Sequence, residues 1–414
     1  MDSVRESERN TPVAYSAQVV VAGGGPAGAM AAVAAGRAGA KTLLIERAGC
    51  AGGIWTSGLF SWMLDVTNKS GLLRELMNRI REKGEGNFGR NGNFLTFPET
   101  VKRELDDMLL DAGVQVLYYA QAAGGVKSGE RLTHVLLESK AGRQAAAGEV
   151  FVDATGDGDL AALSGCRFSL GNESGQLQPA SLIAMVTGIS AGELRAFDSA
   201  LPYMEGRNAK TELLKEMERA GLDPSYRIPC LMHVKDGVWL MMTTHSYGID
   251  PLDPASLTEK TIEARRELYR QEQALRALGG PWKDMRIVAT APAIGIREGR
   301  RILGKYTVTA RDALEGRRHG DAVCRVEYPL DVHPLRAART TAMELGDLKV
   351  KAQPFDIPLR ALESADIENL LLAGRLISGD FLAHSSYRVT GDAAAIGEAA
   401  GREAARRVLQ KVKR

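Results

Sequence analysis

A glycine-rich turn near the N-terminus constrains the fold more than any other feature of this 414-residue sequence. Residues 23–28 (GGGPAG) form a GxGxxG motif between the apolar segment 18–22 (QVVVA) and the small-residue segment 28–38. A second β-rich segment, 41–46 (KTLLIE), follows. Strand, helix and strand within roughly 30 residues predict a βαβ unit, whose two strands are parallel.

The spacing of the glycines matches the needs of a dinucleotide. Gly23 permits a tight turn, Gly25 lets a pyrophosphate approach the backbone, and Gly28 lets the helix pack close to the strand. The helix N-terminus supplies N–H groups and positive potential. Glu46 ends the second strand, where a carboxylate accepts hydrogen bonds from an adenosine ribose. These features alone do not separate NAD from FAD.

Two later segments favour FAD. Residues 152–160 (VDATGDGDL) and 369–379 (NLLLAGRLISG) each place a strand end against a glycine turn, and 385–395 (SSYRVTGDAAA) follows. NAD needs only the first βαβ unit, whereas the ribityl chain and ring of FAD need contacts from distant parts of the chain. A last helix starting near Gly391 directs its N-terminus at the flavin N1–C2=O edge.

The rhythm of strands and helices breaks in the middle of the chain. After residue 165, strands are expected at 182–188 and 237–246 and a helix at 256–278, and then the opening pattern returns. We therefore expect an α/β fold in which a glutathione-reductase-like FAD-binding Rossmann domain carries an inserted α+β substrate domain. The expected domains are 17–165 for the N-terminal part of the FAD-binding domain, 166–292 for the insertion, and 293–414 for the return to the first domain.

Composition excludes several classes of protein. The sequence is 44% hydrophobic and 25% charged, which is typical of a globular chain, and its net charge of +2 provides no strong field for nucleic acid or an anionic membrane. No segment reads as a transmembrane helix. The four cysteines are dispersed, which favours reduced thiols in the cytoplasm and no metal site. The expected partner is a small-molecule substrate, and the oligomeric state stays open.

Several stretches resemble a known family. They are GGIWTSGLFS at 52–61, VDATGDGDLAALSG at 152–165, GIREGRRILGKYTVTARD at 295–312, FDIPLRAL at 355–362 and NLLLAGRLIS at 369–378. The sequence resembles the glutathione-reductase-like flavoproteins, and within them the FAD-dependent oxidoreductase family related to the flavin subunit of heterodisulfide reductase. The resemblance implies FAD binding and redox chemistry but names no substrate. The chain departs from it after Arg388, reading RVTGD where a pattern close to RVMP is expected.

The residues expected to bind FAD come from these turns. They are Gly23, Gly25, Pro26, Ala27, Gly28, Glu46, Arg47, Gly53, Thr155, Gly156, Asp157, Gly374, Arg375 and Gly391.

Three side chains are candidates for catalysis. His384 and Arg388 are expected, with Tyr387, in a loop beside the flavin. Arg388 stabilises anionic reduced flavin or a substrate carboxylate, or else pairs with a nearby acid; His384 is a general base or merely caps a turn. Arg297 either binds an anion or pairs with Glu298. The other histidines are read as structural: His134, His233, His245, His319 and His333. Three residues that follow the glycine pair at 52–53 either line the substrate side of the flavin or belong to the core: Trp55, Trp62 and Met63.

These residues predict an FAD-dependent oxidoreductase that transfers hydride between a small organic molecule and flavin N5, as a dehydrogenase or oxidase. An NAD(P)H-dependent flavin monooxygenase is the alternative enzyme. A non-catalytic FAD-binding or electron-transfer protein is the alternative of another class. An open cavity above the flavin favours an enzyme, and an occluded one favours the non-catalytic protein.

Overall fold

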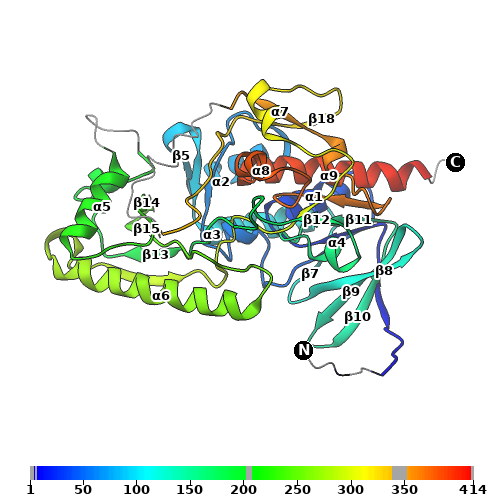
Figure 1. Ribbon diagram of the computed structural model, residues 1–414, viewed down its shortest axis with the longest axis horizontal. Helices are drawn as coiled ribbons and strands as arrows, with labels where there is room; N and C mark the ends of the chain where they lie inside the picture. The colour runs from blue at the N-terminus through cyan, green and yellow to red at the C-terminus, as the bar shows by residue number, and fades with distance from the viewer. Residues whose placement is uncertain (1–3, 5–6, 202–207, 338–351, 412–414) are drawn as a thin grey trace.

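A five-stranded parallel sheet forms the centre of the molecule. The computed structural model describes residues 4, 7–201, 208–337 and 352–411 (Figure 1). All neighbouring strands in this sheet are parallel. In spatial order they are β20 (Leu370–Leu372), β11 (Val150–Asp153), β2 (Val19–Ala22), β3 (Thr42–Ile45) and β7 (Gln115–Leu117). The protein is therefore a mixed α/β fold with a Rossmann-like core, as the opening motif predicts.

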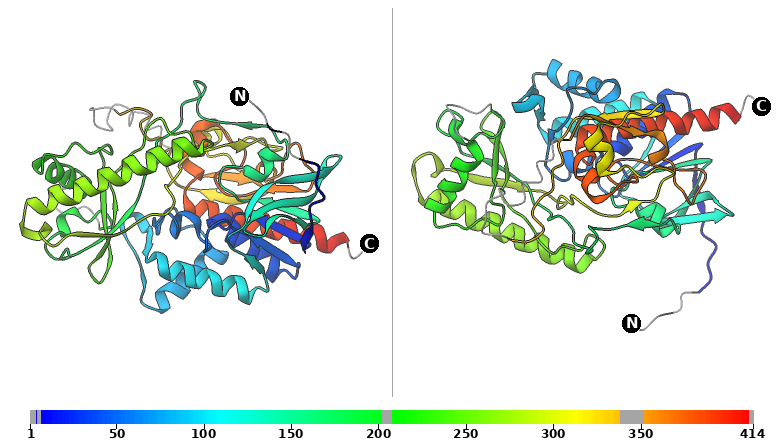
Figure 2. Two further views of the ribbon diagram at one scale, coloured as in Figure 1. Left: turned by 90° about the horizontal axis from the view of Figure 1, so that it is seen from below. Right: turned by 45° about the horizontal axis from the view of Figure 1, so that its top comes forward.

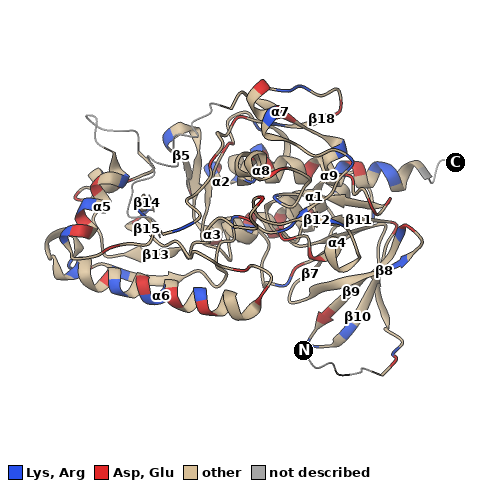
Figure 3. Ribbon diagram, viewed as in Figure 1, with Lys and Arg blue, Asp and Glu red and all other residues tan. Residues whose placement is uncertain are grey.

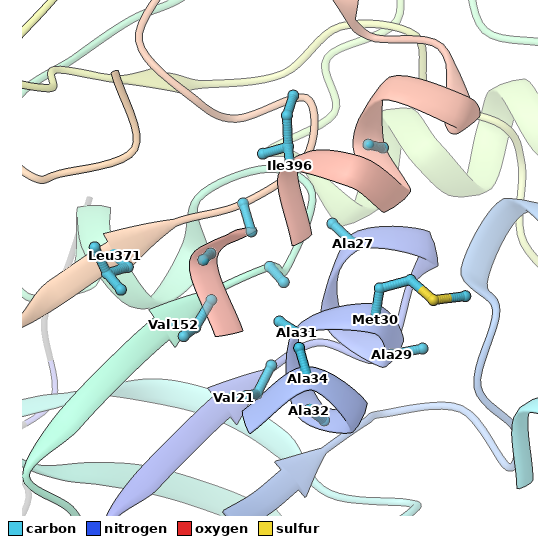
Figure 4. Close-up of a cluster of buried hydrophobic side chains, with 14 of the residues drawn as sticks. Val21, Ala27, Ala29, Met30, Ala31, Ala32, Ala34, Val152, Leu371 and Ile396 are labelled. Carbon is cyan, nitrogen blue, oxygen red and sulfur yellow. The ribbon is translucent and has the colours of Figure 1, made fainter. Parts of the chain in front are cut away.

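Two helices from opposite ends of the chain pack against each other at this sheet. Helix α1 (Pro26–Arg37) starts with a proline at its first turn and consists mostly of small residues, while α9 (Thr390–Lys411) is the last helix. A Cβ added at Gly397 or Gly401 would lie 2.0 or 2.1 Å from a backbone oxygen of α1, so these glycines let the two backbones touch. Figure 4 shows Val21, Val152 and Leu371 of the sheet gathered with side chains of both helices.

A smaller sheet combines β1 (Val13–Ser16), which precedes β2, with three strands that lie between β7 and β11 in the sequence. It comprises β1, β10 (Gly142–Ala147), β9 (Arg131–Ser139) and β8 (Gln121–Ser128), in that spatial order. Residues 132–139 are predicted from the sequence to be a strand and form β9, whereas β8 and β10 are not predicted. Helix α4 (Asp159–Leu163) packs against β8.

A third sheet, called the inserted sheet below because its strands fall between β11 and β20 in the sequence, lies at the other end of the molecule (Figures 1 and 2). Its antiparallel strands are, in spatial order, β14 (Cys230–Lys235), β15 (Val238–Met242), β13 (Ala184–Thr187) and β16 (Arg286–Thr290). This sheet packs with α5 (Ala209–Arg219) and α6 (Pro254–Ala277) around its own apolar core, which includes the buried Trp239 and Trp282.

The remaining elements connect these layers. They are α2 (Gly71–Glu82), α3 (Pro98–Asp111), α7 (Ala310–Glu315), α8 (Phe381–Tyr387), the strands β4 (Trp62–Met63), β5 (Gly86–Phe88) and β6 (Phe94–Thr96), the pair β12 (Phe168–Ser169) and β17 (Arg301–Ile302), and the pair β18 (Ala322–Val326) and β19 (Phe355–Pro358).

The surface mixes charges of both signs. Acidic and basic residues alternate along α5 and α6 in Figure 3, as expected for a chain whose net charge is +2. Within the described ranges, no helix combines the length and apolarity that crossing a bilayer requires.

One expectation about the C-terminal region is wrong. The sequence predicts a long loop between Gly374 and the last helix, but this segment contains α8. Asp380 caps this helix, because its side chain accepts a hydrogen bond from the Ala383 amide at 2.7 Å. His384 and Tyr387 therefore lie in a helix. The sequence predicts that the last helix runs from 391 to 412, and residue 412 lies outside the described residues.

We predict that Gly401→Val destabilises the protein by about 3 kcal/mol, because the new side chain would collide with the backbone of α1. Gly320→Val is the matched control, since a Cβ at Gly320 meets nothing within 4 Å. Urea unfolding of both variants checks the prediction. Equal midpoints for the two variants would contradict the close contact between α1 and α9.

Candidate functional site

The glycine turn between β2 and α1 forms a cradle at the carboxyl edge of the sheet. Gly23 has φ +93°, and a Cβ there would lie 2.4 Å from the Ala154 oxygen. A Cβ on Gly28 would lie 1.7 Å from the Gly23 oxygen, so neither position tolerates a side chain. Gly25, the N-cap of α1, has nothing within 4 Å of its Cβ position. This open space at a helix N-terminus suits a diphosphate.

Glu46 closes the other side of this cradle. The residue is 9% exposed, and its carboxylate accepts hydrogen bonds from the amides of Gly24 at 2.6 Å and Ala48 at 2.7 Å. Each carboxylate oxygen keeps a lone pair for a further donor such as a ribose hydroxyl. Its neighbour Arg47 is exposed.

Segments far apart in sequence meet at the glycine turn. The Gly52 amide donates to the Gly24 oxygen at 2.7 Å, and a Cβ on Gly53 would lie 2.9 Å from the Gly25 Cα. The ends of β11 and β20 are joined by an ion pair of 2.8 Å between Asp157 and Arg375. The structure thus gathers four separate strand ends or turns where the sequence places a cofactor.

The other expected cofactor residues lie at the same edge. Pro26 and Ala27 form the first turn of α1, and a Cβ on Gly374, whose φ is +85°, would lie 3.1 Å from the Ala27 Cβ. Thr155 donates its hydroxyl to Asp153 at 2.7 Å. For Gly156, a Cβ would collide with the Arg375 guanidinium.

Gly391 is in the first turn of α9, against the segment after β4. A Cβ there would lie 2.3 Å from the Leu64 oxygen, and its amide donates to that oxygen at 3.0 Å. The next residue, Asp392, is buried and pairs with Lys69 at 2.9 Å. Burial raises the pKa of Asp392 well above its ordinary value, although the Lys69 ammonium opposes this shift. The stretch RVTGD, where the chain departs from the expected family pattern, therefore contributes a buried ion pair between Asp392 and Lys69.

A cavity of about 520 Å³ lies between this edge and the inserted sheet. Arg375 and Thr390 border it from the cofactor side, and Ile183 and Met242 border it from the inserted sheet. Its walls also contain aromatic side chains, namely Phe60, Trp62, Tyr226 and Tyr328. The fold leaves space for a small molecule beside the expected flavin position.

Arg388 lines the cavity from the end of α8 and is paired with an acid. Its Nη2 donates to the Asp331 backbone oxygen at 2.8 Å and lies 3.3 Å from Asp331 Oδ2. Anion binding and pairing with a nearby acid were considered for Arg388, and the structure shows the ion pair with Asp331.

Arg297 also lines the cavity, and Glu298 is not its partner. The Arg297 Nη1 donates to the Pro179 backbone oxygen at 2.7 Å and to Ser181 Oγ at 2.9 Å, whereas Glu298 pairs with Arg301 at 2.5 Å. Burial, with the nearby Arg388, lowers the pKa of Arg297 to about 10. The side chain therefore remains a cation at neutral pH.

The structure places His384 away from the cavity. The imidazole is 0% exposed inside α8 and is not among the residues that line the cavity. Burial and the cations Arg301 and Arg388 lower its pKa well below the ordinary value. Tyr387 is also buried and donates its hydroxyl to the Ile377 oxygen at 3.1 Å. Placing His384 in a loop was wrong because the capping signal of Asp380 was not read.

The sequence instead missed His333, which does line the cavity. Its Nε2 lies 3.3 Å from Asp331 Oδ2. Burial, assisted by Arg297, lowers the pKa of His333 to about 4, while His333 and Arg388 hold the pKa of Asp331 below its ordinary value. At neutral pH this is a neutral imidazole beside a carboxylate. No local sequence pattern marks it, because tertiary contacts alone bring the two residues to the cavity.

The burial of the aromatic residues after Gly53 and of His245 distinguishes between the roles considered for them. Trp55 and Met63 are fully buried in the main core, whereas Trp62 lines the cavity. His245, read as structural, is buried and stacks on Tyr226 with ring centroids 3.8 Å apart.

Three features together are typical of a dinucleotide-binding oxidoreductase: the glycine cradle, the carboxylate of Glu46 beside it, and the adjoining cavity. Residues 18–413 match the family model described as FAD dependent oxidoreductase. The chain belongs to this family: it is an enzyme that binds FAD. No curated protein sequence matches it.

Several solved structures are similar to this chain at low sequence identity. A geranylgeranyl bacteriochlorophyll reductase-like protein from Thermoplasma acidophilum is 13% identical, with a TM-score of 0.48 over 96% of this chain and 79% of that one. The p-nitrophenol 4-monooxygenase of Pseudomonas putida is 14% identical, with a TM-score of 0.43 over 70% of each chain. The flavin-dependent brominase Bmp2 is 12% identical, with a TM-score of 0.47 over 96% and 80%.

We predict that Glu46→Ala weakens FAD binding at least tenfold, because it removes an acceptor for the ribose and for two backbone amides. Titration of the apoprotein with FAD, followed by flavin fluorescence, checks this. The control is Glu193→Ala, which removes an exposed carboxylate elsewhere in the chain. Unchanged FAD affinity in Glu46→Ala would show that the ribose lies elsewhere.

Proposed function

We propose that this enzyme is a dehydrogenase or oxidase that oxidises a small organic substrate in the cavity. The observation that carries the proposal is the neutral His333, held beside Asp331 in the cavity wall. An imidazole that is uncharged at neutral pH and oriented by a carboxylate has the properties of a general base.

The residues at the sheet edge fit FAD. The amides around Gly25 would hold the diphosphate, Glu46 the adenosine ribose, and Asp157 with Arg375 the segment toward the cavity. Bound FAD supplies a two-electron acceptor that takes hydride at N5.

His333 takes the proton in the proposed reaction. The tautomer that donates Nε2–H to Asp331 leaves the lone pair of Nδ1 to accept a proton. The substrate would lose that proton from an O–H or N–H group and a hydride from the adjacent carbon, so that a C–O or C–N single bond becomes a double bond. Asp331 stabilises the imidazolium that forms, and Arg388 keeps Asp331 ionised.

The cavity walls orient the substrate and limit water. Trp62 and Tyr226 are buried, and with Ile183 and Met242 they form an apolar part of the cavity wall. An apolar lining strengthens the interaction between a charged substrate group and the fixed charges of the site.

The closer relationship to glutathione-reductase-like flavoproteins and heterodisulfide reductase is part of the proposal. Its support is that three strand-end turns, at Gly23, Gly156 and Gly374, come together as that resemblance implies. The cavity also argues against the non-catalytic alternative, for which an occluded site was expected.

Anaerobic mixing of the holoenzyme with NADH or NADPH tests the reaction class. We expect the visible flavin band to stay oxidised with either nucleotide and to bleach with a cognate substrate from a panel of alcohols, amines, and hydroxy and amino acids. Rapid bleaching by a nicotinamide nucleotide alone would overturn the proposal in favour of a monooxygenase or reductase.

We predict that the rate of flavin reduction by such a substrate is constant from pH 9 to 6 and falls as the pH drops toward about 4. The pKa of His333 lies near 4, so the base is neutral above this value and loses its lone pair to a proton below it. His333→Asn should lower the rate constant by about 100-fold or more and remove this acid limb. Stopped-flow absorbance checks both. A wild-type acid limb that persists in His333→Asn would assign the base elsewhere.

A further inference from the structure

We propose that the substrate carries a carboxylate and that Arg297 binds it. This inference rests on the proposed function, because it assumes that the cavity beside the cofactor edge is the substrate site. It adds a chemical class to the substrate and a binding role to a residue that the reaction scheme does not use.

Arg297 is a partly buried guanidinium whose hydrogen bonds go to neutral acceptors. Nη1 donates to the Pro179 backbone oxygen and to Ser181 Oγ, and Nη2 has the Met242 sulfur at 4.0 Å. Among the described residues, no carboxylate lies within ion-pair distance of it, although Asp331 is near enough to act through space. Thioether sulfur is a weak acceptor, so the strongest partner for Nη2 is missing from the protein itself.

The contacts of Arg297 also fix its orientation. Two acceptors on Nη1 hold the plane of the guanidinium, and Ser181 is itself anchored because its hydroxyl donates to the Thr244 oxygen at 2.6 Å. A planar fork held this way presents its remaining N–H groups in a geometry that matches the two oxygens of a carboxylate.

The charges of the cavity wall favour an anion. Arg297 and Arg388 contribute two positive charges beside the single negative charge of Asp331. His333 is neutral at pH 7, and burial keeps the neighbouring Tyr226 phenol neutral by raising its pKa. The other charged residues of the wall are Asp65, Arg90, Lys210, Glu327 and Arg375, so basic residues outnumber acidic ones and an anionic ligand is favoured.

The other residues that line the cavity indicate what the rest of this acid looks like. Phe60, Trp62, Ile183 and Met242 line the same space and offer an apolar surface for the group that follows the carboxylate. The predicted ligand is thus a carboxylic acid with a hydrocarbon or aromatic body, small enough for a cavity of about 520 Å³.

Equilibrium titration of the oxidised holoenzyme, followed by the difference spectrum of its flavin band, tests the inference without turnover. The probes are benzoate, phenylacetate and hexanoate, each compared with its neutral amide. We expect the carboxylates to perturb the band saturably and the amides to bind at least tenfold more weakly. Arg297→Met should weaken carboxylate binding by about 10- to 100-fold, and Arg297→Lys should restore part of it.

The matched control is Arg286→Met, which removes an exposed arginine of the inserted sheet that does not line the cavity; its carboxylate affinity should equal that of the wild type. FAD content and thermal unfolding establish that each variant is folded. If Arg297→Met loses FAD, Arg297→Lys and Ser181→Ala decide the question, with Ser181→Ala expected to weaken binding several-fold because it releases Nη1.

Three results would overturn the inference: no carboxylate perturbs the flavin band, the amides bind as tightly as the acids, or Arg297→Met and Arg297→Lys bind carboxylates like the wild type. A changed flavin midpoint potential in ligand-free Arg297→Lys would also overturn it, because Arg297 would then act on the flavin. Carboxylates that bind through Arg297 while no substrate of the panel reduces the flavin would leave this inference standing and contradict the proposed hydride transfer.

Discussion

The backbone contact between α1 and α9 is the constraint on which the rest of the site depends. Gly397 and Gly401 let the last helix lie directly against Ala27 and Ala31 of the first helix, so the two ends of the chain share one core. This packing carries the start of α9, and with it Thr390, to the carboxyl edge of the parallel sheet. The cofactor edge therefore has contributions from residues separated by nearly the whole sequence.

The cavity results from a second constraint, the insertion of an antiparallel sheet between two parts of the parallel core. Ligands in open α/β sheets bind outside the carboxyl ends of the strands, and here the inserted sheet closes over that position. The cofactor edge supplies glycines and an acid that suit a dinucleotide. The inserted sheet and the loop at 327–333 supply the aromatic walls and the Asp331–His333 pair that suit a substrate.

Local signals explain what the sequence predicts well. The motif at Gly23, the strand–helix–strand order and Glu46 each depend on neighbours in the chain, and the structure forms these elements within one or two residues of the expected bounds. The loop that was expected around His384 is a helix because Asp380 caps it, a signal that was present but not read. His333 was read as structural because Arg297 and Tyr226, which lie far from it in the sequence, come near it only through tertiary contacts. The sequence pattern also predicted too long a strand at 237–246, because β15 ends at Met242.

The central claim is that FAD extends from the Gly23 turn to the start of α9 with its ring bordering the cavity. A crystal structure of the holoenzyme tests it most directly. The account predicts electron density for the diphosphate at the N-terminus of α1, for the ribose at Glu46, and for the flavin ring beside Arg375 and Thr390, with the cavity open next to it. Density for the ring outside this cavity, or a cavity filled by protein side chains in the holoenzyme, would contradict it.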